Sequence, residues 1–449
     1  MLAQLLDDWR HRPTHRRVRA LALPMIMSNL SVPLVSLADS MVAGHLPHAS
    51  DLAAVAVGSA VYTLPVWVCG FLRMGTTGFA AQAAGRNDGG MARRVLVQSL
   101  LLAAAMATLL LVIGWPLLPW VLNLMQPSAR LDALALGYLH IRLWALPAAL
   151  ANYALAGWFL GQQNARVALG ILLVTNLVNV ALNVLFVPGF GWGVDGIAWA
   201  SVAGAWCGVV YACFCVRHAL ARHPGHGHWH RLRRLAEWRP LVAVNRDIFI
   251  RSLALQGVFF ALTVLGTRLG GTFVAANALL LNGLMLTSFA LDGLANAVEA
   301  MSGHAIGARD KPALRRALTV AGGWSLLGSV GFVILFGCGG HLFVNVQTSL
   351  ADVRATAYAY LPYLAALPLV AVTSYLLDGL FVGATRAREM RDTMLCSALV
   401  FALLAWALRP LGNHGLWLAF LAFMAARALA MLWVAQRITR RDGWMALSV

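Results

Sequence analysis

Runs of about twenty or more mostly apolar residues recur along the whole of this 449-residue chain. A helix needs about that many residues to cross the ~30 Å hydrocarbon layer of a bilayer. In this chain 60% of the residues are hydrophobic and 11% are charged, whereas charged residues make up about a quarter of a soluble domain. A transmembrane β-barrel would instead show alternating segments of about ten residues. The sequence therefore predicts an all-α integral membrane protein.

The apolar runs number twelve and predict twelve transmembrane helices. They cover residues 19–43, 52–81, 92–114, 131–160, 166–187, 194–217, 247–270, 273–304, 313–340, 354–384, 391–409 and 414–436. We accordingly expect a tail (1–18), a first lobe of six spans (19–218), a linker (219–245), a second lobe of six spans (246–437) and a second tail (438–449). No apolar region with a small-residue cleavage site follows the basic N-terminus, so we expect the first helix to be retained.

Basic residues are distributed very unevenly between the two sides of these spans. Of the 34 Lys and Arg residues, 27 lie in the two tails, in the linker and in the other loops of the same side, counting Arg251 with the linker. The opposite side has four: Arg130, Arg268, Arg354 and Arg409. Three fall inside spans: Arg73, Arg142 and Arg427. Because cytoplasmic loops carry the excess of Lys and Arg, we expect both termini in the cytoplasm. The net charge of +17 is thus an orientation signal and requires no nucleic acid.

The two halves of the chain repeat each other. The segment GWFLGQQNAR (157–166) resembles GLFVGATRAR (379–388), and GRNDGGMARR (85–94) resembles GARDKPALRR (307–316), both at an offset of 222 residues. A repeat of six spans, an even number, gives two lobes of the same orientation. They should be pseudo-symmetric about an axis along the membrane normal, an arrangement found in secondary transporters.

Several acidic side chains fall inside or at the edge of spans, where insertion of a charge costs about 2.5–3.5 kcal/mol. They are Asp39, Asp195, Asp292, Glu299 and Asp378. Such residues are functional candidates by default. For Asp292 and Asp378, the alternative is a static ion pair with Arg73 or Arg142.

Helical spacing places these acids on stripes with other polar side chains. Asn29, Ser36 and Asp39 share one face of the first span. Asn176, Asn179 and Asn183 share one face of the fifth, and Asp292 and Glu299 share one face of the eighth. Asparagines also form purely structural hydrogen bonds between membrane helices. Pro33 removes a backbone hydrogen bond next to the first stripe, which predicts a hinge there.

The chemistry of a carboxylate among amides allows two ions. A carboxyl group away from water can exchange protons near neutral pH, and carboxylate and amide oxygens can alternatively hold Na⁺. The phosphate-binding motif GxxxxGK[ST] is absent from the sequence, as are HExxH and GxSxG. The pattern therefore indicates a transporter without a cofactor, driven by an ion gradient or by a partner, and not an enzyme.

The ordered motifs resemble the multidrug and toxic compound extrusion family over residues 17–437. They are LADSMVAGHL (37–46), TNLVNVALNVLFV (175–187) and LDGLANAVEAMSGHAIGARD (291–310). The segment YLLDGLFVGATRAR (375–388) resembles in particular the branch named for the DNA-damage-inducible protein F.

This resemblance implies a monomeric antiporter of the bacterial inner membrane that exports amphipathic, often cationic, organic compounds. It assigns coupling to Asp39, with Asn179 and Asn183, and adds Asn176, Asp195 and Ser201. Some relatives carry an aspartate at the position of Asn183, which leaves the coupling stoichiometry open. The seventh span, SLALQGVFFALTVLGTRLG (252–270), lacks the glutamate of the sodium-coupled branch, which favours protons. The substrate-cavity candidates are Asn29, Ser36, Asn152, Asp292, Glu299 and Asp378.

Other interpretations remain open at this point. A lipid-linked oligosaccharide flippase of the same superfamily would carry about fourteen spans and a strongly cationic cavity, and Na⁺ could replace H⁺. The histidines of the linker, His223, His226, His228 and His230, could bind a metal, although a basic loop against anionic headgroups is the simpler interpretation.

Overall fold

The computed structural model describes residues 2–125, 128–222, 225 and 232–445; the side chains of residues 2, 3, 32–36 and 222 lie outside this description. The chain forms two compact units. We call residues Met27–Arg239 the N-lobe, and residues Met1–Ile26 with Pro240–Val449 the C-lobe.

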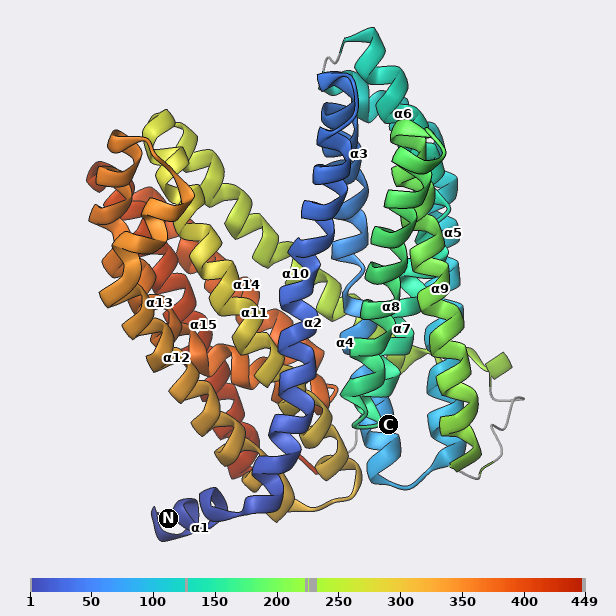
Figure 1. Cartoon of the computed structure of the whole chain (residues 1–449). Helices are drawn as coiled ribbons and strands as arrows, with labels where there is room; N and C mark the ends of the chain where they lie inside the picture. The colour runs from blue at the N-terminus through green and yellow to red at the C-terminus, as the bar shows by residue number, and fades with distance from the viewer. Residues whose placement is uncertain (1, 126–127, 223–224, 226–231, 446–449) are drawn as a thin grey trace. The chain divides into compact units, whose positions relative to one another are not determined.

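The N-lobe consists of helices separated by short turns (Figure 1). Its elements are the second part of α2 (Arg12–Gly44), α3 (Ala49–Val68), α4 (Phe71–Gly85), α5 (Gly89–Leu124), α6 (Ala129–Leu143), α7 (Leu146–Gly161), α8 (Ala165–Val184) with a π-helical turn η1 (Leu185–Gly189), α9 (Gly193–Arg222) and a short 3₁₀ turn η3 (Leu235–Glu237). Helix α7 is central to this lobe and packs against α4, α5, α8 and α9.

The C-lobe is built in the same manner. Its elements are α1 (Leu2–Arg10), the first part of α2, α10 (Arg239–Thr267), α11 (Gly271–Gly307), α12 (Lys311–Gln347), α13 (Ala351–Gly383), α14 (Ala387–Ala407), a 3₁₀ turn η4 (Arg409–Leu411) and α15 (Gly412–Arg440). Helix α13 packs against α11, α12 and α15. Its apolar stretch is 67% buried, against 44% or less for the other candidate spans. It therefore forms the core of the lobe.

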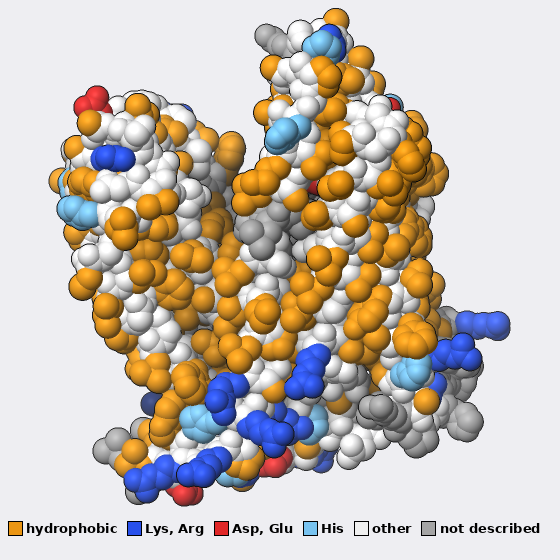
Figure 2. All heavy atoms as spheres, viewed as in Figure 1, with side chains coloured by type: hydrophobic (Ala, Val, Ile, Leu, Met, Phe, Trp, Pro, Cys, Tyr) orange, Lys and Arg blue, Asp and Glu red, His pale blue; other side chains and the backbone are white. Residues whose placement is uncertain are grey.

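The helices agree with the predicted membrane spans in order and position. Among the described residues, ten helical stretches are long and apolar enough to cross a membrane, and the pair α6–α7, bent by 46°, makes an eleventh. Helix α2 covers the first predicted span, 19–43. On the face that Figure 2 shows, hydrophobic side chains cover much of each lobe, and Lys and Arg side chains gather mainly at one end. This is the pattern of a protein whose sides face lipid.

The sequence repeat corresponds to a repeated packing contact. A Cβ at Gly157 would lie 2.3 Å from the backbone oxygen of Arg73, and one at Gly379 would lie 2.3 Å from the backbone oxygen of Ala295. These contacts join α7 to α4 and α13 to α11, and each involves the first glycine of a GxxxG pair. Small residues at this spacing allow membrane helices to approach closely. The duplicated halves therefore share a helix–helix interface as well as a sequence pattern.

The turns repeat as well. Asn87 and Arg309, 222 residues apart, both have a positive φ, of 54° and 56°. In the next position, Asp88 and Asp310 each cap a helix by accepting a hydrogen bond from a backbone N–H three residues later, at 2.8 Å. Such caps satisfy donors that the first turn of a helix leaves unpaired.

The boundary between the units falls inside α2. The N-terminal residues pack within the C-lobe: the Asp8 carboxylate accepts a hydrogen bond from Arg315 Nε at 2.5 Å, and the ring of Trp9 lies 6.5 Å from that of Trp324. A Cβ at Gly293 would meet Ile26 at 2.2 Å. The compact N-lobe thus begins at Met27.

Candidate functional site

The carboxylate of Asp39 is buried inside the N-lobe. Its side chain is on α2 with 6% of its surface exposed. Its Oδ1 atom accepts a hydrogen bond from Asn183 Nδ2 on α8 at 2.6 Å. The two residues are 144 positions apart in sequence, so only the packing of the lobe brings them together.

The contact with Asn183 continues as a chain of hydrogen bonds. Asn183 Nδ2 also lies 3.4 Å from Asn179 Oδ1, and Asn179 Nδ2 donates to Ser201 Oγ on α9 at 2.9 Å. Asn179 and Asn183 are one helical turn apart, which places both on the face of α8 that meets α9. Gly204 keeps that interface close, because a Cβ there would lie 2.6 Å from the Thr175 backbone oxygen.

The orientation of the Asn183 amide follows from chemistry. An ionised carboxylate only accepts hydrogen bonds, so the amide must present its NH₂ group to Asp39. The amide oxygen, Asn183 Oδ1, is buried and has no hydrogen-bond partner among the described residues. A buried acceptor without a donor is costly, and a donor appearing at Asp39 would lower that cost.

Asp39 also interacts with a cation. The guanidinium of Arg142, near the end of α6, lies over the ring of Tyr62 at 4.3 Å. It is hydrogen-bonded to Tyr138 and interacts electrostatically with Asp39. The Tyr138 hydroxyl is in turn 3.0 Å from Ser59 Oγ. Asp39 thus interacts with both an amide donor and a positive charge.

Other predicted N-lobe residues lie around this chain of hydrogen bonds or outside it. Asn152 donates to the backbone oxygen of Ala205 at 2.9 Å. Asn29 and Asn176 are partly exposed, and Asp195 is exposed at the start of α9. The proposed hinge at Pro33 and the stripe residue Ser36 lie outside the described side chains, although the backbone is helical there.

The acid Asp378 of the C-lobe has partners that the sequence pattern did not identify. Its Oδ2 atom accepts hydrogen bonds from Arg251, at 2.5 Å, and from Arg427. All three side chains are buried. A static ion pair for Asp378 was among the expectations, but with Arg73 or Arg142. Both of those arginines belong to the N-lobe.

Arg251 was missed for a simple reason. Counting it with the linker treated it as a loop residue, whereas it is 7% exposed in the middle of α10. Its position four residues inside the predicted span 247–270 was the signal that could have identified it. Two cations and one carboxylate make this cluster an ion-pair triad and not a ready cation site.

The other C-lobe acids lie on α11. Asp292 is partly buried and interacts electrostatically with Arg251, and Glu299 is 2% exposed. Asn277 and Asn413 form a reciprocal amide pair at 2.8 and 3.0 Å, which illustrates the structural use of asparagine between membrane helices.

The described part of the chain holds no group of metal ligands: no three His, Cys, Asp or Glu side chains there could hold an ion together. The linker histidines His223, His226, His228 and His230 lie outside the described residues.

Buried charges and amides within a duplicated bundle of apolar helices are typical of membrane transporters. Comparison with known proteins identifies the family. The MatE family profile matches residues 24–185 and 248–408, one match in each half of the chain, and the chain belongs to this family. Its members are transporters and not enzymes.

Relatives match along nearly the whole chain. The sequence is 41% identical over 426 residues to "DNA damage-inducible protein F" of Escherichia coli K12, covering 95% of this chain and 93% of that protein. It is 28% identical to "Probable multidrug resistance protein NorM" of Rhizobium meliloti, covering 98% and 97%. A solved structure described as "MATE in the bent conformation" superposes with a TM-score of 0.86 at 19% identity, covering 96% and 97%.

Proposed function

We propose that the protein is an antiporter that exports amphipathic, often cationic, organic compounds in exchange for protons. Relatives named as multidrug resistance proteins support multidrug efflux as its general role. The absence of an ATP-binding loop from the sequence supports a cation gradient as the energy source.

The observation that carries the proposal is the hydrogen bond from Asn183 to the buried Asp39. Ionised Asp39 accepts this bond and attracts a positively charged group. Protonated Asp39 carries an O–H group that can donate to the Asn183 carbonyl oxygen, which has no hydrogen-bond donor among the described residues. Protonated Asp39 also no longer attracts a cation. The two states therefore favour a cationic substrate and a proton in turn, which is the requirement for antiport.

The surroundings of Asp39 support H⁺ over Na⁺. A hard cation requires several oxygen ligands, whereas the Asn183 amide presents N–H groups to the carboxylate. A proton needs only one carboxylate oxygen and adds no ligand shell.

In the proposed cycle, Asp39 is ionised when substrate binds and protonated when substrate leaves. Protonation changes the attraction between α2 and its neighbours α6 and α8, and we propose that α2 bends near Pro33 in response. Alternating exposure of Asp39 to the two sides of the membrane completes the exchange.

We further propose a monomer in the bacterial inner membrane with both termini in the cytoplasm. The support is the excess of Lys and Arg in the tails and in the loops of that side. On this view the bilayer, and not nucleic acid, is the partner of the basic surface.

Dye efflux in inverted vesicles tests the coupling ion. An imposed pH gradient should drive dye transport, and a Na⁺ gradient of equal size at constant pH should not. Transport driven by Na⁺ alone would refute proton coupling, while transport driven by neither gradient would refute the antiport mechanism.

A further inference from the structure

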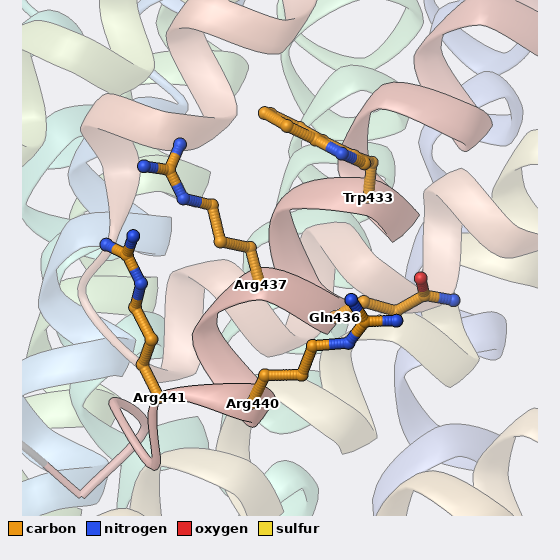
Figure 3. Close-up of a pocket in the computed structure, with 5 residues that line it drawn as sticks. All are labelled: Trp433, Gln436, Arg437, Arg440 and Arg441. Carbon is orange, nitrogen blue, oxygen red and sulfur yellow. The ribbon is translucent and has the colours of Figure 1, made fainter.

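The end of the last helix, α15, forms a small basic pocket (Figure 3). It has a volume of about 200 Å³ and is lined by Trp433, Gln436, Arg437, Arg440 and Arg441. A water molecule takes up about 30 Å³ in the liquid, so the pocket has room for a phosphate group with some of its hydration.

The lining residues form two rows along the helix. Trp433, Arg437 and Arg441 follow one another at a spacing of four, and Gln436 and Arg440 form a second row. Residues four apart lie on the same helix face. The side chains of Arg437 and Arg441 extend to one side, and that of Arg440 extends beside Gln436 (Figure 3).

The pocket has an excess of positive charge. The acid nearest in sequence, Asp442, forms an ion pair with Lys311 at the start of α12. Arg437 lies over the ring of Trp433 at 5.7 Å, a cation–π arrangement that leaves its N–H donors available. The three guanidiniums therefore suit a ligand with several anionic oxygens, since arginine binds phosphate through paired N–H groups.

The same helix face changes from apolar to aromatic to basic along its length. Leu429 and Trp433 have 66% and 61% of their surfaces exposed, and Arg437 and Arg441 follow at the same spacing. Exposed tryptophan is typical of the membrane–water interface. A lipid chain alongside Leu429 would place its headgroup at the three arginines.

The helix dipole gives a partial reason for basic residues at this end, because cations near a helix C-terminus are stabilised. It does not account for the exposed tryptophan one turn earlier or for the concave arrangement of the side chains. The apolar face, the aromatic residue and the three arginines match, in this order, the acyl chains, the interface and the anionic headgroup of a phospholipid.

We propose that this pocket binds the phosphate headgroup of an anionic phospholipid. Binding there anchors the end of α15 at the membrane surface. The site is independent of Asp39 and of the ion that drives transport.

The test is a titration of the purified full-length protein in detergent with phosphatidylglycerol, followed by native mass spectrometry. The variant R437Q/R440Q/R441Q should bind on the order of a hundredfold more weakly, since each basic residue near an anionic lipid contributes a several-fold gain. Phosphatidylcholine, which has no net charge, should bind the wild type no better than the variant.

A matched control removes three exposed arginines of the opposite side: R130Q/R268Q/R409Q loses the same charge and should bind phosphatidylglycerol like the wild type. Equal weakening in both triple variants, or equal binding in all three proteins, would overturn the proposal. Displacement of the lipid by inorganic phosphate would also overturn it, because the pocket would then be a site for free anions. A thermal melt of each variant in detergent confirms that the protein compared is folded.

Discussion

Replacing Asp39 by asparagine separates the structural from the coupling role of this residue. The side chains are nearly isosteric, and the asparagine oxygen can accept the same hydrogen bond from Asn183, now 2.6 Å long. The bond changes from charge-assisted, worth about 1.5–3 kcal/mol, to neutral, worth about 0.5–1.5 kcal/mol. For this bond we therefore expect Asp39→Asn to lower the free energy of unfolding by only about 1 kcal/mol; the substitution also removes the attraction to Arg142.

The effect on transport should be complete. In the hydrogen-bonded chain Asp39–Asn183–Asn179–Ser201, the carboxyl group is the member that can gain and lose a proton. For exchange of one proton against one monovalent cation, a gradient of one pH unit is worth about 1.4 kcal/mol and sustains about a tenfold substrate gradient. The variant should sustain none.

The assay uses inverted vesicles with an imposed gradient of about one pH unit and a fluorescent cationic dye as the substrate. Asp88→Asn is the matched control, because Asp88 is an exposed helix cap in the same lobe and asparagine caps equally well. Dye accumulation by Asp39→Asn at the wild-type level would refute the assignment of Asp39. Loss of accumulation in both variants would show that the charge change acts through the fold.

Three further substitutions have defined outcomes. Asn183→Asp places a second carboxylate against Asp39, so the pair should hold one proton more than the wild type at neutral pH. Potentiometric titration of the two proteins in detergent measures the number of bound protons, and an equal number in both would contradict the geometry. Asp378→Leu removes the carboxylate that two buried arginines bind and should lower the free energy of unfolding by about 3–5 kcal/mol, seen as a lower melting temperature. An unchanged melting curve would show that solvent compensates the two charges. Gly157→Val should abolish accumulation of folded protein, because its Cβ would lie 2.3 Å from a backbone oxygen, whereas a Cβ at Gly328 would have nothing within 4 Å and Gly328→Val should be tolerated. Fluorescence-detected gel filtration measures the yield of folded protein, and equal yields of the two variants would contradict the close helix contact.

Composition and periodicity were sufficient to predict the spans and the duplication. Membrane insertion requires a local property, about twenty apolar residues in succession, and a repeat is likewise visible in the letters themselves. The GxxxG pairs at 157–161 and 379–383 illustrate this, since the matching close contacts appear at both. Helical spacing also places Asn179 and Asn183 on one face, because residues four apart share a face whatever the helix packs against.

Tertiary structure alone decided which polar side chains meet. Asp39 and Asn183 are brought together across 144 residues, and a helical stripe carries no information about the helix that it faces. Arg251 shows the same limit, because its partner Asp378 lies 127 residues away. The sequence determined where the helices cross the membrane because that depends on transfer of local apolar surface from water. The structure decided the site because the cost of a buried charge is offset only by partners that packing supplies.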